Sequence, residues 1–119
     1  MSKQKITFTT EEESNFDNTR VGSLVPVRLK ELRKKHGLTQ TDVATVLEVS
    51  TREYWRYEQD GYNTNYINLL HLAAFYNVSL DYIFGLVQEE RPVYTENDKL
   101  RLHMISVEQY KKQKAEAEQ

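Results

Sequence analysis

The chain contains 119 residues with a formal net charge of −2 and no cysteine, and this length suits one domain with extensions. Without cysteine there are neither disulfides nor thiolate metal ligands, so an intracellular, cytoplasmic protein is expected. No apolar run approaches the roughly 18 residues that a membrane span needs, and the N-terminus lacks a signal-peptide core. Residues 26–86 carry seven basic and seven acidic side chains, a balance that argues mildly against a nucleic-acid-binding protein, which is usually visibly basic.

Residues 1–22 show no helical period. Alternation over residues 5–9 is compatible with a short edge strand, whereas residues 10–20 are polar and acidic. This composition favours disorder, and we expect a flexible N-terminal arm.

The first helix is predicted to begin near Ser23. Val25, Leu29, Leu32 and His36 follow the i, i+4, i+7, i+11 spacing of one buried helix face. The glycine at position 37 suits the residue just after a helix end.

Two capping boxes then lie eleven residues apart. Thr39 precedes Asp42 by three residues, and Ser50 precedes Glu53 by three. In each pair the hydroxyl can accept the backbone N–H of the acidic residue, and the carboxylate can accept the backbone N–H of the hydroxyl residue, which starts a helix. They predict one helix to Leu47, a tight connection, and a second helix to about residue 59. This arrangement is a helix-turn-helix. Its inward apolar positions are Val43, Ala44, Leu47, Val49, Tyr54 and Tyr57, and the outward face of the second helix carries Thr51, Arg52, Trp55, Arg56 and Gln59.

Two further helices complete the predicted domain. Residues 66–76 are apolar on nearly every side, as expected for the centre of a small bundle. Ser79 is expected to cap a fifth, short helix that ends before Gly85. Residues 23–86 are therefore predicted to form an all-α, five-helix domain.

A linker and one more helix are predicted for residues 87–119. Thr95 and Asp98 form a third capping box, and the helix is expected to continue to about residue 114, with residues 111–119 frayed. Leu100, Met104 and Val107 make a narrow apolar stripe. Either the stripe joins two subunits, or the helix packs on its own domain and residues 59–70 form the dimer interface.

The residues over about 24–86 resemble the phage repressor and Cro type (xenobiotic response element type) of helix-turn-helix regulator. The resemblance rests on several features in register: the Leu38-Thr39-Gln40 entry, the small Ala44, Val49-Ser50 at the turn, Glu58, and Asn-Val-Ser-Leu-Asp-Tyr over residues 77–82.

This resemblance implies roles for individual residues. Gln40 would donate to a phosphate, and Thr51, Arg52 and Arg56 would reach base edges in the major groove. Arg33 and Glu58 would form a buried structural ion pair. From their chemistry, an arginine fork matches guanine or phosphate, and the backbone N–H groups near Thr41 and Thr51 suit an anion.

Three departures from the family pattern bear on affinity. Glu48 stands where the family usually has a left-handed glycine. Glu53 could read cytosine, but completing its capping box is the favoured role. Trp55 replaces a small polar residue and suits either DNA sugars and methyl groups or a protein partner.

We expect a sequence-specific regulator of transcription, a homodimeric repressor that reads an inverted repeat in double-stranded DNA. The alternative is a protein-interaction module on the same fold, antitoxin-like or an adaptor, that binds through Trp55, Tyr62 and Tyr66. No enzyme activity, metal or cofactor is expected, because His36, His71 and His103 stand alone and no catalytic set or glycine-rich phosphate loop occurs.

Overall fold

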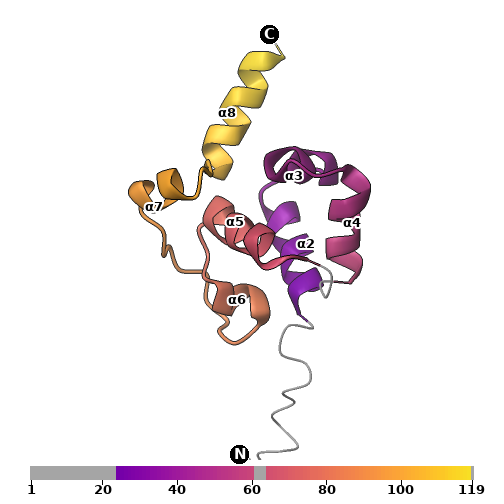
Figure 1. Ribbon diagram of the computed structural model, residues 1–119, viewed down its shortest axis with the longest axis vertical. Helices are drawn as coiled ribbons and strands as arrows, with labels where there is room; N and C mark the ends of the chain where they lie inside the picture. The colour runs from indigo at the N-terminus through magenta and orange to yellow at the C-terminus, as the bar shows by residue number, and fades with distance from the viewer. Residues whose placement is uncertain (1–23, 61–63, 119) are drawn as a thin grey trace, which may run out of the picture.

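The computed structural model describes residues 24–60 and 64–118, which form seven helices and no strand (Figure 1). The predicted all-α fold is therefore confirmed. The predicted N-terminal arm and Tyr62 lie outside the described residues. In the described ranges no helix is long and apolar enough to span a bilayer. The helices are α2 Val25–Lys35, α3 Gln40–Leu47, α4 Thr51–Gln59, α5 Tyr66–Tyr76, α6 Leu80–Phe84, α7 Glu96–Arg101 and α8 Val107–Ala117.

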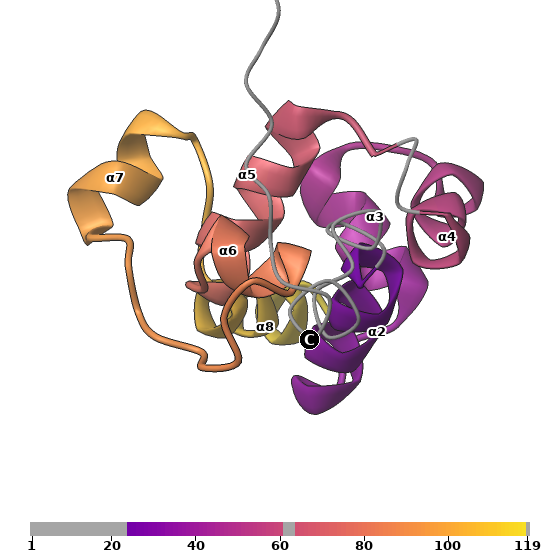
Figure 2. The same cartoon turned by 90° about the horizontal axis from the view of Figure 1, so that it is seen from below.

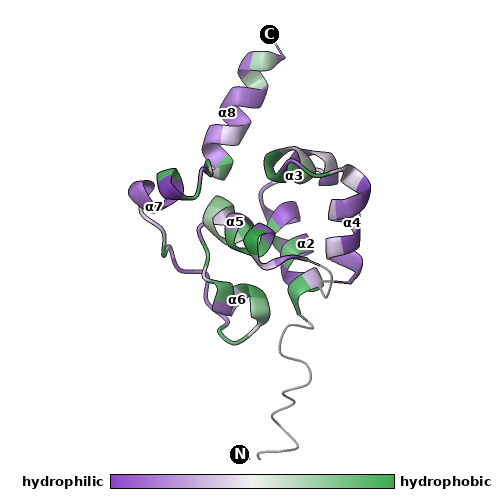
Figure 3. Ribbon diagram, viewed as in Figure 1, coloured by the Kyte–Doolittle hydropathy of each residue, from purple (hydrophilic) through white to green (hydrophobic). Residues whose placement is uncertain are grey.

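Helices α2 to α6 enclose one hydrophobic core. Seven of the eleven residues of α5 are buried, and hydrophobic residues gather in α5 and α6, whereas α4 and α8 are largely hydrophilic (Figure 3). This distribution matches the all-round apolar pattern predicted for residues 66–76. The inward positions of the motif are also buried, namely Val43, Ala44, Leu47, Tyr54 and Tyr57, with Val49 packed against the core.

Local hydrogen bonds set the helix starts. The side chains of Thr39, Ser50, Asn65 and Ser79 each accept the backbone N–H three residues on, which satisfies a donor that the first turn leaves without a partner. Four of the five helices of the domain therefore begin where a short polar side chain caps them.

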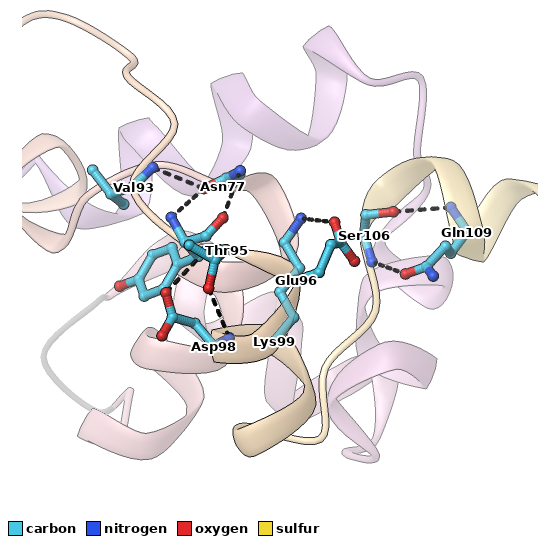
Figure 4. Close-up of polar contacts among 9 residues, drawn as sticks. Asn77, Val93, Thr95, Glu96, Asp98, Lys99, Ser106 and Gln109 are labelled. Atoms are coloured by element: carbon cyan, nitrogen blue, oxygen red, sulfur yellow. Dashed lines mark hydrogen bonds and ion pairs between the residues drawn. The ribbon is translucent and has the colours of Figure 1, made fainter.

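The C-terminal segment differs from the prediction. The predicted additional helical segment is present. The prediction of one continuous helix over residues 95–114 is wrong, because the chain forms two helices, α7 and α8, with a bend between them. His103 adopts a left-handed conformation with φ 54°, and Ser106 starts α8 through a capping box with Gln109 (Figure 4). Residues 111–117, expected to fray, belong to α8.

The break in the helix divides the predicted apolar stripe. Met104 and Val107 are buried in the core of the chain itself, whereas Leu100 is 72% exposed. The described structure thus has this segment packed on its own domain. Helix α7 lies on the opposite side of the molecule from α4 in both views (Figures 1 and 2).

Asn77 attaches the connecting segment to the domain. Its Oδ1 accepts the backbone N–H groups of Val93 at 2.9 Å and Tyr94 at 2.8 Å, and its Nδ2 donates to the Tyr94 carbonyl (Figure 4). Asn77 also ends α5 in a left-handed conformation, a position that asparagine tolerates better than most residues. One side chain therefore both ends α5 and sets the path toward α7.

Candidate nucleic-acid interface

The first turns of α3 and α4 lie side by side. The Thr41 and Thr51 hydroxyls are 3.3 Å apart, and the Thr39 cap is a complete capping box with Asp42. The N-termini of two helices therefore lie close together. Such an arrangement favours a negatively charged ligand.

Glu48 makes the turn between the two helices. It has φ 59° and ψ 40°, the left-handed conformation that glycine adopts most easily. Its N–H donates to the Thr45 carbonyl, and the Val49 N–H donates to the Ala44 carbonyl at 3.0 Å. These two bonds are the pattern that ends helices at a left-handed residue. The turn keeps the geometry expected of glycine although it carries a side chain.

The outward face of α4 is polar and cationic. Thr51, Arg52, Trp55, Arg56 and Gln59 are exposed, while Tyr54 and Tyr57 on the opposite face are buried. Within the described ranges neither Arg52 nor Arg56 has an ion-pair partner. Both guanidinium groups are thus available to a ligand, and the ring of Trp55 is 45% exposed between them along the helix.

Glu53 makes half of its predicted capping box. Its backbone N–H donates to the Ser50 hydroxyl at 3.0 Å, but among the described residues its carboxylate does not return a bond to the Ser50 N–H. The reciprocal half of this prediction is wrong. The carboxylate instead lies near the Tyr57 hydroxyl, where burial raises the pKa of Tyr57 and Glu53 adds to the increase.

Arg33 and Glu58 meet in a two-pronged ion pair below the interface. Arg33 Nε donates to Glu58 Oε2 at 2.7 Å and Nη2 donates to Oε1 at 3.0 Å, while Nη1 reaches the Leu38 carbonyl. The side chains are 12% and 1% exposed. Burial alone would raise the pKa of Glu58, but the hydrogen bonds from Arg33 and Gln40 outweigh it and lower that pKa. The pair joins the end of α2 to the end of α4.

Gln40 is attached to this pair. Its Nε2 donates to Glu58 Oε1 at 3.3 Å, so the Glu58 carboxylate orients the amide. A primary amide has two N–H donors, and one of them remains for a ligand. The position fits a phosphate donor whose orientation is preset.

Asp42 has a role that reasoning from the sequence missed. Beyond its capping bond to the Thr39 N–H, its Oδ1 accepts the Tyr110 hydroxyl at 2.7 Å and Lys114 Nζ at 2.8 Å, both from α8. Burial alone would raise the pKa of Asp42, but these bonds hold it well below its usual range. The same contact and burial raise the pKa of Tyr110 to about 12. No local pattern links residues 68 and 72 positions apart.

Other features lie away from this face. His36 stacks on Tyr76 with ring centroids 5.5 Å apart. A groove of about 490 Å³ lies beside α5 and α7, lined by Leu70, Val93, Tyr94, Asp98, Arg101 and Leu102. In the part of the chain that the structure describes, no group of three or more His, Asp or Glu side chains could hold a metal ion.

Comparison with known proteins places the motif in a family context. Residues 29–83 match the family model described as helix-turn-helix. The uncharacterized HTH-type transcriptional regulator YobD of Bacillus subtilis (strain 168) is 37% identical over 65 residues, 55% of this chain and 58% of that protein. The HTH-type transcriptional regulator ImmR of the same organism is 41% identical over 58 residues, 49% and 46% of the two chains. This chain spans about half the length of these curated relatives. No solved structure matches it significantly.

Proposed function

We propose that the chain is a cytoplasmic, sequence-specific regulator of transcription that binds double-stranded DNA, because residues 29–83 match the helix-turn-helix family model. The observation that carries the proposal is the outward face of α4. There Thr51 and two arginines that have no ion-pair partner among the described residues lie beside the N-termini of α3 and α4. Arginine can contact guanine O6 and N7 through two parallel hydrogen bonds. The names of both relatives describe HTH-type transcriptional regulators, which supports the same function.

In this proposal each residue has one task. Thr51, Arg52 and Arg56 reach base edges in the major groove, Trp55 contacts the sugar and methyl surface, and Gln40 and Thr41 bind phosphate. Glu53 lies next to these residues on α4 and makes no base contact itself. Arg33 and Glu58 keep α4 in place from below.

We also propose that the chain acts as a homodimer on an inverted repeat, as a repressor. One subunit offers two arginines and a domain without excess positive charge, which are few contacts for specific binding at physiological salt. Two subunits double the contacts and read half-sites about 34 Å apart. Of the two surfaces predicted for pairing, the 59–70 region has exposed apolar residues, with Tyr66 79% and Ile67 43% exposed, whereas most of the other stripe is buried.

Selection of bound sequences from a random duplex pool tests the proposal. The full chain should enrich one sequence with two-fold symmetry. Recovery of no preferred sequence, at low salt and with a chain that circular dichroism shows to be folded, would contradict sequence-specific binding.

A second function follows from the exposed aromatic side chains. A protein-interaction module would use Trp55 and Tyr66, and the near-neutral domain suits such a role. Salt distinguishes the two, since DNA binding weakens steeply with salt through counterion release and an aromatic contact does not. A salt-insensitive complex with a protein, together with no DNA binding, would favour the module.

A further inference from the structure

The contact between α8 and α3 reaches the first turn of the proposed DNA interface. Asp42 lies one residue after Thr41 and two after Gln40, the residues that we assign to phosphate. Its side chain is 7% exposed and is held by partners from two directions, the Thr39 N–H on one oxygen and α8 on the other. A carboxylate fixed by three donors has little freedom, and the helix turn that carries it is fixed with it.

Tyr110 and Lys114 have separate supports. The ring of Tyr110 packs edge-to-face on Phe75 with centroids 6.3 Å apart, so α5 orients the hydroxyl that Asp42 accepts. Lys114 is 45% exposed, and its ammonium group neutralises Asp42 from the solvent side. Without this cation a negative charge would stand close to the proposed phosphate contacts, where it would repel the DNA backbone.

We propose that Tyr110 and Lys114 are positioning residues for DNA binding, through which α8 fixes the first turn of α3. The inference rests on the proposed function. The effect extends to α4, because Thr41 contacts Thr51 across the motif. Helix α8 projects beyond the five-helix domain on the side of α3 (Figure 1). It contacts Asp42 through Tyr110 and Lys114, while residues 111–118 are exposed.

Two variants of the full chain separate positioning from direct contact. Tyr110→Phe removes the hydroxyl and keeps the ring on Phe75, and Lys114→Met removes the charge and keeps the length. Lys112→Met, an exposed lysine on the same helix, is the matched control for charge. Affinity for one duplex is measured by fluorescence anisotropy at several salt concentrations, at a temperature where circular dichroism shows each variant fully folded.

We expect Tyr110→Phe and Lys114→Met each to weaken binding roughly fivefold or more, the scale of coupling between two sites, with Lys112→Met close to the parent. The slope of log affinity against log salt should stay unchanged in Tyr110→Phe, which keeps every charge. In Lys114→Met the uncompensated Asp42 carboxylate should change the slope by well under one unit. A slope reduced by about one unit in Lys114→Met would mean that Lys114 itself binds a phosphate and would overturn its positioning role.

Failure of this inference can be told from failure of the proposed function. If the parent binds the duplex and both variants bind as tightly, only the inference fails, and the contact is merely structural. If the folded parent binds no duplex, the proposed function fails and the inference falls with it.

Discussion

At the scale of single residues, α4 separates side chains that hold the fold from side chains that face solvent. Tyr54, Tyr57 and Glu58 are buried, whereas Arg52 and Arg56 are exposed. Changes on the two faces should therefore have different consequences. The buried face should govern the free energy of unfolding, and the exposed face should govern binding.

Arg52→Ala and Arg56→Ala test the exposed face. Each should cost roughly 1–3 kcal/mol of specific DNA binding if it pairs with a base. Unfolding free energies should change by less than about 0.5 kcal/mol, as is usual for surface substitutions. Anisotropy titrations and urea melts measure the two quantities, with the exposed Lys30→Ala as a control for lost charge. Parent-like affinity in both variants would remove these residues from the interface.

Arg33→Ala and Glu58→Ala test the buried pair. Removing one partner leaves the other charge buried and unpaired, so stability should fall by about 3–5 kcal/mol. At a temperature where the variant is folded, Arg33→Ala should bind DNA like the parent, whereas Glu58→Ala should bind somewhat more weakly because it also removes the acceptor that orients Gln40. Denaturant melts that coincide with those of the parent would show that the pair contributes no stability.

At the scale of elements, the motif depends on a strained turn. Glu48 occupies a left-handed conformation that places Cβ close to backbone oxygen, and two hydrogen bonds to α3 hold it there. The bend between α7 and α8 has the same left-handed backbone conformation at His103. In both places the packing of the following helix selects a backbone conformation that the local residue disfavours.

Glu48→Gly should therefore stabilise the domain. Relief of the left-handed conformation is worth about 1 kcal/mol, less the entropy that glycine adds to the unfolded chain. Glu48→Ala is the matched control, since it removes the carboxylate and keeps Cβ, and it should give no gain. Thermal melts compare the two. Equal stability of both variants would show that the side chain, not the backbone conformation, sets the effect.

At the scale of the whole molecule, the surfaces available for pairing are set by how α7 and α8 pack. The burial of Met104 and Val107 leaves Leu100 as the exposed member of the predicted stripe. The exposed apolar residues at the start of α5 are adjacent in sequence and lie on the same helix. Exposed apolar side chains at the start of a helix make this end of α5 a candidate for a surface that joins subunits.

Ile67→Lys therefore tests the dimer. A buried lysine without a partner opposes association, so sedimentation should shift from dimer to monomer, and specific DNA binding should weaken with it. Leu100→Lys, which places the same charge at an apolar and more exposed position on α7, should leave the dimer intact. If Leu100→Lys dissociates the dimer and Ile67→Lys does not, the interface lies in the C-terminal segment.

The sequence by itself determined the elements whose hydrogen bonds close within a few residues. Capping side chains and apolar spacing were enough to predict the starts of α3, α4 and α6, the all-α fold, and the outward face of α4, and the resemblance to a helix-turn-helix family is confirmed for residues 29–83. The Ser106 and Gln109 capping box can also be read from the sequence. It indicates a helix start at residue 106, although the apolar spacing of Leu100, Met104 and Val107 suggests one continuous helix.

Only the tertiary structure decided the contacts between distant segments. The packing of α7 and α8 on the domain decides two such contacts. Asp42 binds α8 as well as capping its own helix, and Met104 and Val107 are buried in the chain's own core instead of being exposed to a second subunit. Local sequence specifies which groups can donate, accept or become buried. Which partners they meet depends on the packing of helices that are far apart in the chain. That packing sets which apolar surfaces leave water and which charges come within hydrogen-bonding distance.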